Sequence, residues 1–245
     1  MAPLLSVVIP AHNEADHLRA LVPETAAVLA SSLDFEIVVV DDASTDRTPE
    51  VLRDLQQSIP FLSIVRHRKQ CGQSTALMTG IDAARGRIIA TMDGDAQNDP
   101  ADLIHMLDRY MSCLSNEGAS AVICGHRVHR RDSKWRKVSS RIANKIRSVI
   151  LRDATPDSGC GIKLFSREEF LRLPRFDHMH RFLPALFRRD GCRIVSVPVR
   201  HRPRLSGRSH YGTIGRTLAG IVDMLGVYWL NSRYRSTEAE REPTR

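Results

Sequence analysis

The chain has 245 residues, of which 42% are hydrophobic and 26% are charged, and its formal net charge is +8. This composition is typical of a globular protein and excludes disordered, collagen-like and disulfide-framework proteins. The length fits one large α/β domain or two small ones. The five cysteines are scattered singly, with no C-x-x-C pair. Such a set predicts reduced thiols in a cytosolic protein and no zinc site.

The N-terminal residues carry neither a basic leader nor a long apolar segment, so we expect no signal peptide. A bilayer span needs roughly 20 apolar residues in a row. The most apolar stretch, Thr217–Leu230, is shorter than that and contains Asp223. The sequence therefore predicts no helix that crosses a membrane.

Apolar runs typical of strands alternate with segments of helical periodicity along the first half of the chain. In chain order, the predicted elements are a strand at Leu5–Ile9, a helix at His17–Ala30, a strand at Phe35–Val40, a helix at Pro49–Leu55, a strand at Leu62–Val65, a helix at Ser74–Ala84, a strand at Arg87–Met92, a helix at Pro100–Leu114 and a strand at Ala121–Cys124. Regular alternation of this kind predicts βαβ units, and hence an α/β fold with a mostly parallel sheet flanked by helices.

The second half of the chain continues with fewer strands. Its predicted elements are a basic amphipathic helix at Lys134–Leu151, a short helix at Arg181–Arg189, a strand at Arg193–Arg200 and a final helix at Ile214–Leu230. We expect a single domain over residues 1–231, followed by a polar tail over residues 232–245.

Charge is distributed unevenly between the two halves. Residues 1–125 hold 9 Lys and Arg against 17 Asp and Glu, a net charge of −8, whereas residues 126–245 hold 27 against 11, a net charge of +16. Between His126 and Arg152 there are ten basic residues and one acidic residue, Asp132. A half with this charge predicts an anionic partner, which could be nucleic acid, a phosphorylated ligand or an acidic membrane surface.

Polar clusters follow three of the predicted strands where they end: His12-Asn13-Glu14, Asp41-Asp42 and Asp93-Gly94-Asp95. Ligands of open α/β sheets bind beyond the carboxyl ends of the strands, so these clusters predict a site. Two carboxylates separated by one residue can both face Mg²⁺ or Mn²⁺. Each cluster alone is also compatible with a polar turn or a helix cap. Their coincidence at one edge favours a nucleotide–metal site.

Several common motifs are missing from the chain. There is no G-x-x-x-x-G-K-[ST], which disfavours a P-loop NTPase, and no G-x-G-x-x-G after the first predicted strand, which disfavours a dinucleotide dehydrogenase. A G-x-S-x-G elbow is absent as well, which disfavours an α/β-hydrolase.

Segments in both halves resemble known enzymes. Three runs resemble family 2 glycosyltransferases of GT-A fold: Val7-Val-Ile-Pro-Ala-His-Asn-Glu14, Val39-Val-Asp-Asp-Ala-Ser-Thr-Asp46 and Thr91-Met-Asp-Gly-Asp-Ala-Gln-Asn-Asp-Pro100. Two later runs resemble the bacterial polyprenyl-phosphate glycosyltransferases, the dolichol-phosphate mannose synthase-like branch: His180-Arg-Phe-Leu-Pro-Ala-Leu186 and His201-Arg-Pro-Arg-Leu-Ser-Gly-Arg-Ser-His-Tyr-Gly212. The resemblance covers residues 5–215. It implies a GT-A, Rossmann-like fold and metal-dependent transfer of a sugar from a GDP- or UDP-sugar to a polyprenyl or dolichyl phosphate.

The resemblance implies that residues 1–125 form the donor half of the site. The residues expected to hold the base and ribose of the nucleotide-sugar are Pro10, His12, Glu14, Val39 and Asp41. The residues expected to position Mg²⁺ or Mn²⁺ on the diphosphate are Asp93, Asp95 and Gln97, with Asp95 also placed among the catalytic residues. The backbone of Gly94 is expected close to the nucleotide.

Residues 126–231 are expected to form the acceptor half. By the same resemblance, Arg127 and Arg141 are catalytic residues that face the acceptor phosphate, while Arg204 and His210 clamp the donor phosphates. Two positions depart from the family pattern. His12 stands where an aromatic Tyr is usual, and His210 stands where the G-x-S-K loop has Lys. A protonated His210 would restore the missing charge, and Arg208 lies close by to compensate.

The chemistry that the resemblance implies agrees with the charge of the chain. A lipid monophosphate has a second pKa of about 6 and is already anionic near neutral pH. It needs positioning more than deprotonation, and arginines suit that task because they bind phosphate oxygens bidentately. We therefore expect in-line displacement with inversion and no essential general base.

Two alternatives stay open at this point. One is a family 2 glycosyltransferase with a soluble or glycan acceptor, and the other is a basic nucleic-acid-binding protein, for which the chain has few aromatic stacking platforms. The apolar side of Ile214–Leu230 predicts either packing on the protein's own core or contact with a membrane surface or a small membrane partner. We expect a cytoplasmic protein that is peripheral at the cytoplasmic face of the membrane.

Overall fold

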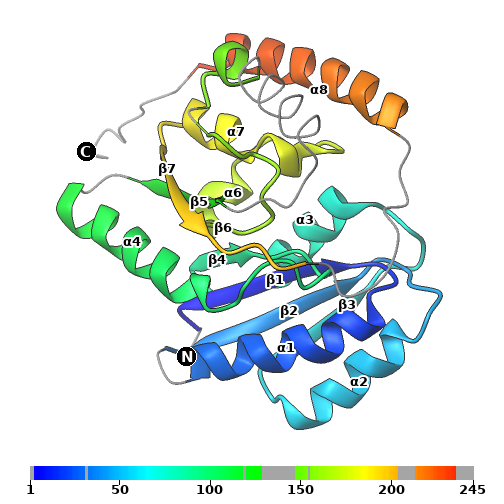
Figure 1. Cartoon of the computed structure of the whole chain (residues 1–245). Coiled ribbons are helices and arrows are strands. Elements are labelled where there is room, and N and C mark those ends of the chain that lie inside the picture. Colours follow the sequence, from blue (N-terminus) through cyan, green and yellow to red (C-terminus); the bar gives the residue numbers. More distant parts are fainter. Residues whose placement is uncertain are drawn as a thin grey trace, which may run out of the picture.

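The computed structural model describes residues 3–30, 33–117, 120–128, 147–153, 155–203 and 213–235. Seven strands form one sheet in the order β3-β2-β1-β4-β6-β5-β7 (Figure 1). The strands are β1 (Leu5–Ala11), β2 (Phe35–Asp41), β3 (Leu62–Arg66), β4 (Ile88–Thr91), β5 (Ala121–Arg127), β6 (Lys163–Ser166) and β7 (Arg193–Val199). Strand β6 runs antiparallel to β4 and β5, and the other strand pairs within the described residues are parallel. The predicted α/β fold with a mostly parallel central sheet is confirmed.

Helices cover both faces of the sheet (Figure 1). One face is covered by α1 (Ala15–Ala30), α2 (Thr48–Ser58) and α4 (Asp102–Glu117). The other face is covered by α3 (Gln73–Ala83), α6 (Arg167–Leu171), the 3₁₀ helix η1 (Met179–Arg181), α7 (Leu183–Arg189) and α8 (Thr213–Arg233). Successive strand residues point to opposite faces, so Val7 and Ile9 lie in the first core and Val8 in the second.

The strand register brings the polar clusters together. Ala11 at the end of β1 pairs with Asp41 at the end of β2. Strand β4 pairs with β1 on its other side, and its last residue Thr91 lies opposite Val8. The loops that follow these three strands therefore meet at one edge of the sheet, as the sequence predicts.

Several elements differ from the prediction. Strand β6 and helix α6 were not expected, because the four residues of β6 read Lys-Leu-Phe-Ser and show neither a long apolar run nor clear alternation. Helix α7 begins two residues later than the predicted Arg181–Arg189, since η1 precedes it. Helix α8 reaches Arg233, two residues into the predicted polar tail. Most of the predicted helix Lys134–Leu151 lies outside the described residues. Its described part, residues 147–151, is helical.

Among the helices that the structure describes, none has an apolar segment long enough to cross a bilayer. The five cysteines all lie within the described residues and are free thiols.

Candidate active site

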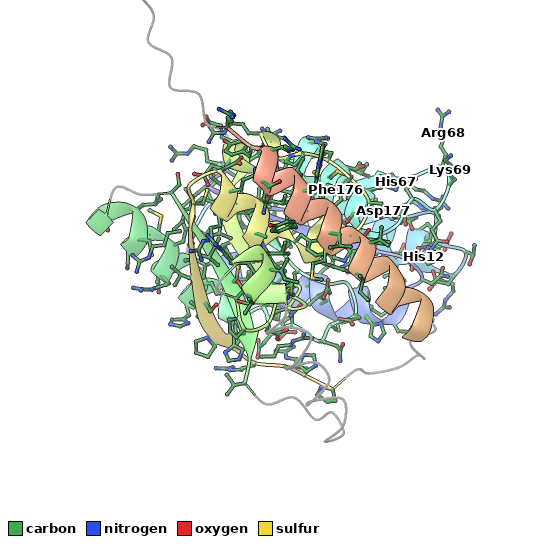
Figure 2. The ribbon with its side chains drawn as sticks, turned by 90° about the horizontal axis from the view of Figure 1, so that it is seen from above. His12, His67, Arg68, Lys69, Phe176 and Asp177 are labelled. Atoms are coloured by element: carbon green, nitrogen blue, oxygen red, sulfur yellow. The ribbon has the colours of Figure 1, made fainter. Side chains whose placement is uncertain are left out.

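The loops that follow β1 and β2 are tied to each other. The Nδ1–H of His12 (Figure 2) donates to the main-chain oxygen of Asp42 at 2.7 Å, because a carbonyl oxygen can only accept. The side-chain oxygen of Asn13 accepts bonds from the main-chain N–H groups of Thr45 at 2.8 Å and Asp46 at 3.2 Å. These bonds fix the relative positions of the two loops that carry the predicted base- and ribose-binding residues.

The two acidic residues at the end of β2 are both buried and have different partners. Asp41 accepts a bond from the N–H of Ser44 at 2.9 Å and lies 3.1 Å from Nε of Arg66. Asp42 accepts bonds from His67 at 2.7 Å and from the main-chain N–H groups of Cys71 and Gly72 at 2.8 Å, all in the loop that follows β3. Burial alone raises the pKa of Asp42, but these three bonds outweigh it and hold the pKa below its ordinary value. Asp42 therefore joins the loops that follow β2 and β3.

The other residues predicted to bind the base and ribose are Pro10, Glu14 and Val39. The Val39 side chain is fully buried in the core, so only its backbone is available to a ligand. Pro10 is buried in β1. The carboxylate of Glu14 accepts a hydrogen bond from Nδ1 of His17 in α1, and the main-chain N–H of Glu14 donates to the hydroxyl of Thr48 at 3.0 Å. Glu14 therefore fixes the start of α1 in this structure.

The loop after β4 holds the acidic pair. Nε2 of Gln73 donates to Oδ1 of Asp93 at 2.8 Å, and the main-chain N–H of Asp93 donates to Oδ1 of Asn98 at 3.2 Å. The N–H of Gln97 donates to Oδ1 of Asp95 at 3.2 Å. Burial, reinforced by the negative charge of Asp95, raises the pKa of Asp93 to about 6. A divalent cation would relieve this repulsion, and the carboxylate and amide oxygens fit Mg²⁺ or Mn²⁺.

Two glycines let other backbone segments approach this loop closely. A Cβ atom at Gly161 would lie 2.1 Å from a carboxylate oxygen of Asp93. A Cβ atom at Gly94 would lie 2.9 Å from the main-chain oxygen of Pro10. Neither position accepts a side chain without a shift of its neighbours. The segment that leads into β6 therefore forms a wall directly against Asp93.

A cavity of about 380 Å³ opens beside Asp93. On its wall, Arg127 at the end of β5 forms a bidentate pair with Asp157, with both N–H···O distances 2.7 Å. Lys163 of β6 is buried, lines the same cavity and donates to the main-chain oxygen of Cys160. The positive charges of Lys163 and Arg127 oppose the rise in the pKa of Asp93. The cavity thus brings together the carboxylates of Asp93 and Asp157, the half-buried Arg127 and the buried Lys163.

The segment after β7 is fastened to the acidic loop. The main-chain N–H of Arg202 donates to the carbonyl oxygen of Gln97 at 2.9 Å. Its guanidinium binds both carboxylate oxygens of Glu24 in α1 at 2.7 Å and lies 2.8 Å from Asp99. The hydrogen bonds to Glu24, and after them the contact with Asp99, raise the pKa of Arg202. The acidic loop, α1 and the end of β7 are therefore held together by one side chain.

Comparison with known proteins identifies the family. The profile of glycosyl transferase family 2 matches residues 6–173, which is more than half of the chain. The chain belongs to glycosyltransferase family 2. The relatives of this family 2 glycosyltransferase include a dodecaprenyl-phosphate galacturonate synthase of Rhizobium johnstonii, 36% identical over 95% of the chain and 68% of that protein. An undecaprenyl-phosphate 4-deoxy-4-formamido-L-arabinose transferase of Edwardsiella ictaluri is 30% identical over 85% of the chain and 63% of that protein. The chain thus spans about two thirds of the length of these relatives.

Solved structures share the fold of this family 2 glycosyltransferase. Glucosyl-3-phosphoglycerate synthase of Mycobacterium tuberculosis, in complex with Mn²⁺, UDP and glucosyl-3-phosphoglycerate, aligns with a TM-score of 0.66 and 19% identity, covering 96% of this chain and 82% of that one. A mannosyltransferase of Pyrobaculum calidifontis, in complex with GDP-Man and Mn²⁺, aligns with a TM-score of 0.60 and 20% identity, covering 98% and 66%. The predicted GT-A fold is confirmed.

The candidate site of this family 2 glycosyltransferase also includes residues that the sequence did not predict. Gln73, Asp157 and Lys163 line the cavity, yet none belongs to a polar cluster after a predicted strand. The available signal was the run Asp157-Ser-Gly-Cys-Gly161, which is rich in small residues and is followed by Lys163 two positions later. Three predicted site residues lie outside the described residues: Arg141, Arg204 and His210.

Proposed function

We propose that this family 2 glycosyltransferase transfers a sugar from a UDP- or GDP-sugar to a polyprenyl phosphate, with Mg²⁺ or Mn²⁺ as the metal. One observation carries the proposal: the carboxylate of Asp93, the half-buried Arg127 and the buried Lys163 line one cavity of about 380 Å³. The relatives that are 30 to 36% identical are named as transferases to polyprenyl phosphates. A site for two phosphorylated substrates needs both a metal-binding acid and separate cations.

The donor half, residues 1–125, would bind the nucleotide-sugar at the edge formed by β1, β2 and β4. Asp93, Asp95 and Gln97 would hold the metal on the diphosphate. The loops after β1 and β2, with His12 and Asp41, would hold the base and ribose. The bonds already made inside these loops support this role, because a prearranged loop loses little entropy when a ligand binds.

The acceptor half, residues 126–231, would bind the lipid phosphate. Asp157 takes one edge of the Arg127 guanidinium, and an arginine has five N–H donors, so donors remain for phosphate oxygens. Lys163 adds a second positive charge in the cavity. The roles of Arg141, Arg204 and His210 stay predictions, since these residues lie outside the described part of the chain.

The proposed reaction is a direct displacement. A phosphate oxygen of the acceptor attacks the anomeric carbon and forms the new C–O bond, while the bond to the nucleoside diphosphate breaks and its oxygen keeps the electron pair. The bound metal supplies positive charge that stabilises the departing diphosphate. Arg127 orients the attacking phosphate, which is anionic near neutral pH and needs no general base. Attack from the opposite face inverts the anomeric configuration.

The chemistry of the acceptor also indicates where the enzyme works. A polyprenyl chain is apolar and is held in a bilayer, so its phosphate lies at the bilayer surface. We propose that the protein acts as a peripheral protein at the cytoplasmic face of the membrane. The basic charge of residues 126–245 agrees with attraction to an anionic leaflet.

The first experiment is a transfer assay. Release of nucleoside diphosphate from a panel of UDP- and GDP-linked hexoses, uronic acids and pentoses is measured with Mn²⁺ or Mg²⁺, with and without a short polyprenyl phosphate. An Asp95→Ala variant tests the metal site, and Asp54→Ala, on the exposed side of α2, is its matched control. NMR of the product reports the anomeric configuration.

Release that requires the lipid and disappears only in Asp95→Ala supports the proposal and identifies the donor. Donor binding without transfer to the lipid would contradict the proposed acceptor and would favour a soluble or glycan acceptor. Absence of metal-dependent donor binding would contradict the whole proposal. An Arg127→Lys variant separates the two substrates, because it should raise the KM for the polyprenyl phosphate more than the KM for the donor.

A further inference from the structure

In the part of helix α8 whose side chains the structure describes, residues 220–233, one side packs against the rest of the protein. Val227 is 1% exposed and belongs to the core cluster that α7 shares, with Met224 and Leu230 partly buried against it. On the same side, the carboxylate of Asp223 accepts a bond from Nδ1 of His178 at 2.9 Å. These residues make the contacts between the described part of α8 and the rest of the domain. The opposite side of this part of the helix therefore contributes nothing to the core.

The opposite side of α8 is apolar and exposed. We call it the outer face of α8, and its residues are Ile221, Val222, Leu225, Tyr228 and Trp229, which are 46 to 69% exposed. Between positions 220 and 230 the one charged residue is Asp223, which lies on the inner side. A helix on a protein surface ordinarily turns polar residues outward. A contiguous exposed apolar face of this kind marks an interaction surface.

The composition of the outer face favours a lipid surface over a protein. Tyr and Trp combine a large apolar ring with a polar atom, which suits the boundary between headgroups and acyl chains. The exposed Arg233 and Arg235 follow at the C-terminal end of the helix, where they would meet lipid phosphates. The second half of the chain carries a net charge of +16, which attracts an anionic leaflet. An apolar face next to basic residues is the pattern of an interfacial helix.

We propose that the outer face of α8 lies in the headgroup region of an anionic lipid bilayer and docks the enzyme there. Figure 2 looks down on this side of the molecule and shows α8 lying across it, with Phe176 and Asp177 labelled beside the helix. Figure 1 shows the same helix above α7, away from the sheet.

The docked helix is linked to the cavity wall. Its Asp223 is bonded to His178, and His180 and Arg181 of the adjoining η1 line the cavity. An enzyme docked through α8 would therefore hold the cavity next to the bilayer surface, where the phosphate of a polyprenyl lipid lies. The link between docking and the acceptor phosphate rests on the proposed function. Docking itself can be measured without donor or acceptor.

Vesicle binding tests the docking. The full chain is floated with vesicles of phosphatidylcholine, alone or mixed with phosphatidylglycerol, without any polyprenyl phosphate. We expect binding to the mixed vesicles that weakens as salt is added. The double variant Leu225→Ser/Trp229→Ser should bind at least roughly tenfold more weakly, because it removes two large apolar side chains from the interface. The matched control, Met111→Ser/Leu114→Ser, changes two exposed apolar residues of α4 and should bind like the parent protein.

Tryptophan fluorescence locates the contact. The chain has two tryptophans, Trp135 and Trp229, so a Trp135→Phe variant reports on Trp229 alone. Its emission should shift to shorter wavelength on anionic vesicles and should be quenched by brominated lipids. Circular dichroism and donor binding of each variant confirm that it is folded.

Three results would overturn the proposal: no binding to anionic vesicles, equal binding by the α8 double variant, or Trp229 emission unchanged on vesicles. Light scattering measures the oligomeric state and so tests whether a second copy of the chain covers the outer face of α8. A dimer of the parent protein that the α8 variant disrupts would assign the outer face to self-association instead. If vesicles bind but no sugar is transferred, the docking holds and the proposed function fails. If sugar is transferred to a short, soluble polyprenyl phosphate but the protein does not bind vesicles, the proposed function holds and the docking fails.

Discussion

The two halves of the site are held in place by different interactions. The loops after β1 and β2 are fixed largely by side chains that accept bonds from main-chain N–H groups: Asn13, Asp41 and Asp42. The cavity wall on the other side is fixed by ion pairs. Arg127 pairs with Asp157 at 2.7 Å, and the buried Arg147 pairs with Asp153 at 2.8 Å. Loss of one partner of a buried pair leaves an uncompensated charge. Changes in the first half should therefore affect chemistry, and changes in the second should affect the fold as well.

The largest effect is expected for Asp93→Asn, which removes charge from the donor half while keeping the shape of the side chain. Asparagine can still accept the bond from Gln73, so the loop should keep its structure. We expect kcat/KM to fall roughly 100- to 1,000-fold, the scale of losing a group that stabilises the transition state, with little change in the melting temperature. The assay is metal-dependent release of nucleoside diphosphate.

The proposed difference between the two halves is that changes in the donor half affect chemistry alone. It would be contradicted if Asp93→Asn lowered the melting temperature as much as Asp157→Asn does. The latter variant deprives the half-buried Arg127 of its bidentate partner and should lose stability along with activity. Asp54→Asn, on the exposed side of α2, should leave both quantities unchanged.

A smaller loss is expected for Gly161→Ala, at the contact between the two halves. The added methyl group would lie 2.1 Å from a carboxylate oxygen of Asp93, so the carboxylate or the segment before β6 must move. A misplacement of about 1 Å costs up to roughly 100-fold in rate, and we expect a loss of 10- to 100-fold. Gly220→Ala, where a Cβ meets no atom within 4 Å, is the control and should keep full activity. Unchanged activity in Gly161→Ala would show that Asp93 has room to rearrange.

The donor half was predictable because its signals are local. Each strand from β1 to β4 is a short apolar run, and the polar residues that follow come directly after it in sequence. Parallel strands place their ends at one edge, so Asp41 and Asp93 could be brought together without knowledge of any distant contact. The boundaries of β1 and β4 still differed by one or two residues, because hydrogen bonding rather than hydrophobicity ends a strand.

The cavity side was predictable only in part. Strand β6 is short and antiparallel, and it inserts between β4 and β5, which a pattern along the chain does not reveal. Arg127 was identified by resemblance, but its partner Asp157 is 30 residues away and lies outside the runs that carry the resemblance. Lys163 is a charged residue at the start of β6, and its sequence predicts an exposed position, whereas the fold buries it. These features depend on long-range pairing, to which sequence periodicity is blind.

A still smaller effect is expected for Arg202→Lys, which tests whether the end of β7 positions the acidic loop. Lysine keeps the charge but cannot bind both oxygens of Glu24 and reach Asp99 as well. The ion pair is partly exposed, so stability should fall by less than about 1 kcal/mol, while kcat/KM should fall several-fold through displacement of the loop that holds Asp95.

Glu24→Gln provides the comparison, because Arg202 then keeps Asp99 as a partner and the loss should be smaller. A decrease in stability without any change in kcat/KM would assign Arg202 a purely structural role.

The smallest effect is expected for Glu36→Gln, near the amino end of β2 and far from the carboxyl ends of the strands, where a buried carboxylate stabilises the donor half. Glu36 is buried in β2 and accepts bonds from the hydroxyl of Ser6 at 2.6 Å and from Nε of Arg85 at 2.9 Å. Burial alone raises the pKa of Glu36, but the bonds from Ser6 and Arg85 outweigh it, so the pKa lies below 4.5. A carboxylate whose pKa is lowered on folding stabilises the native state above its unfolded pKa.

This contribution is fully present above about pH 4.5 and is lost as the pH falls through the lower pKa of the folded state. Urea denaturation at pH 7 should show Glu36→Gln less stable than the parent protein by about 1 kcal/mol, the scale of one hydrogen bond. The difference should shrink as the pH is lowered below 4.5. Glu50→Gln, in an exposed pair with Arg53, should show no difference at either pH. A deficit in Glu36→Gln that stayed constant with pH would mean that side-chain packing rather than charge stabilises this position.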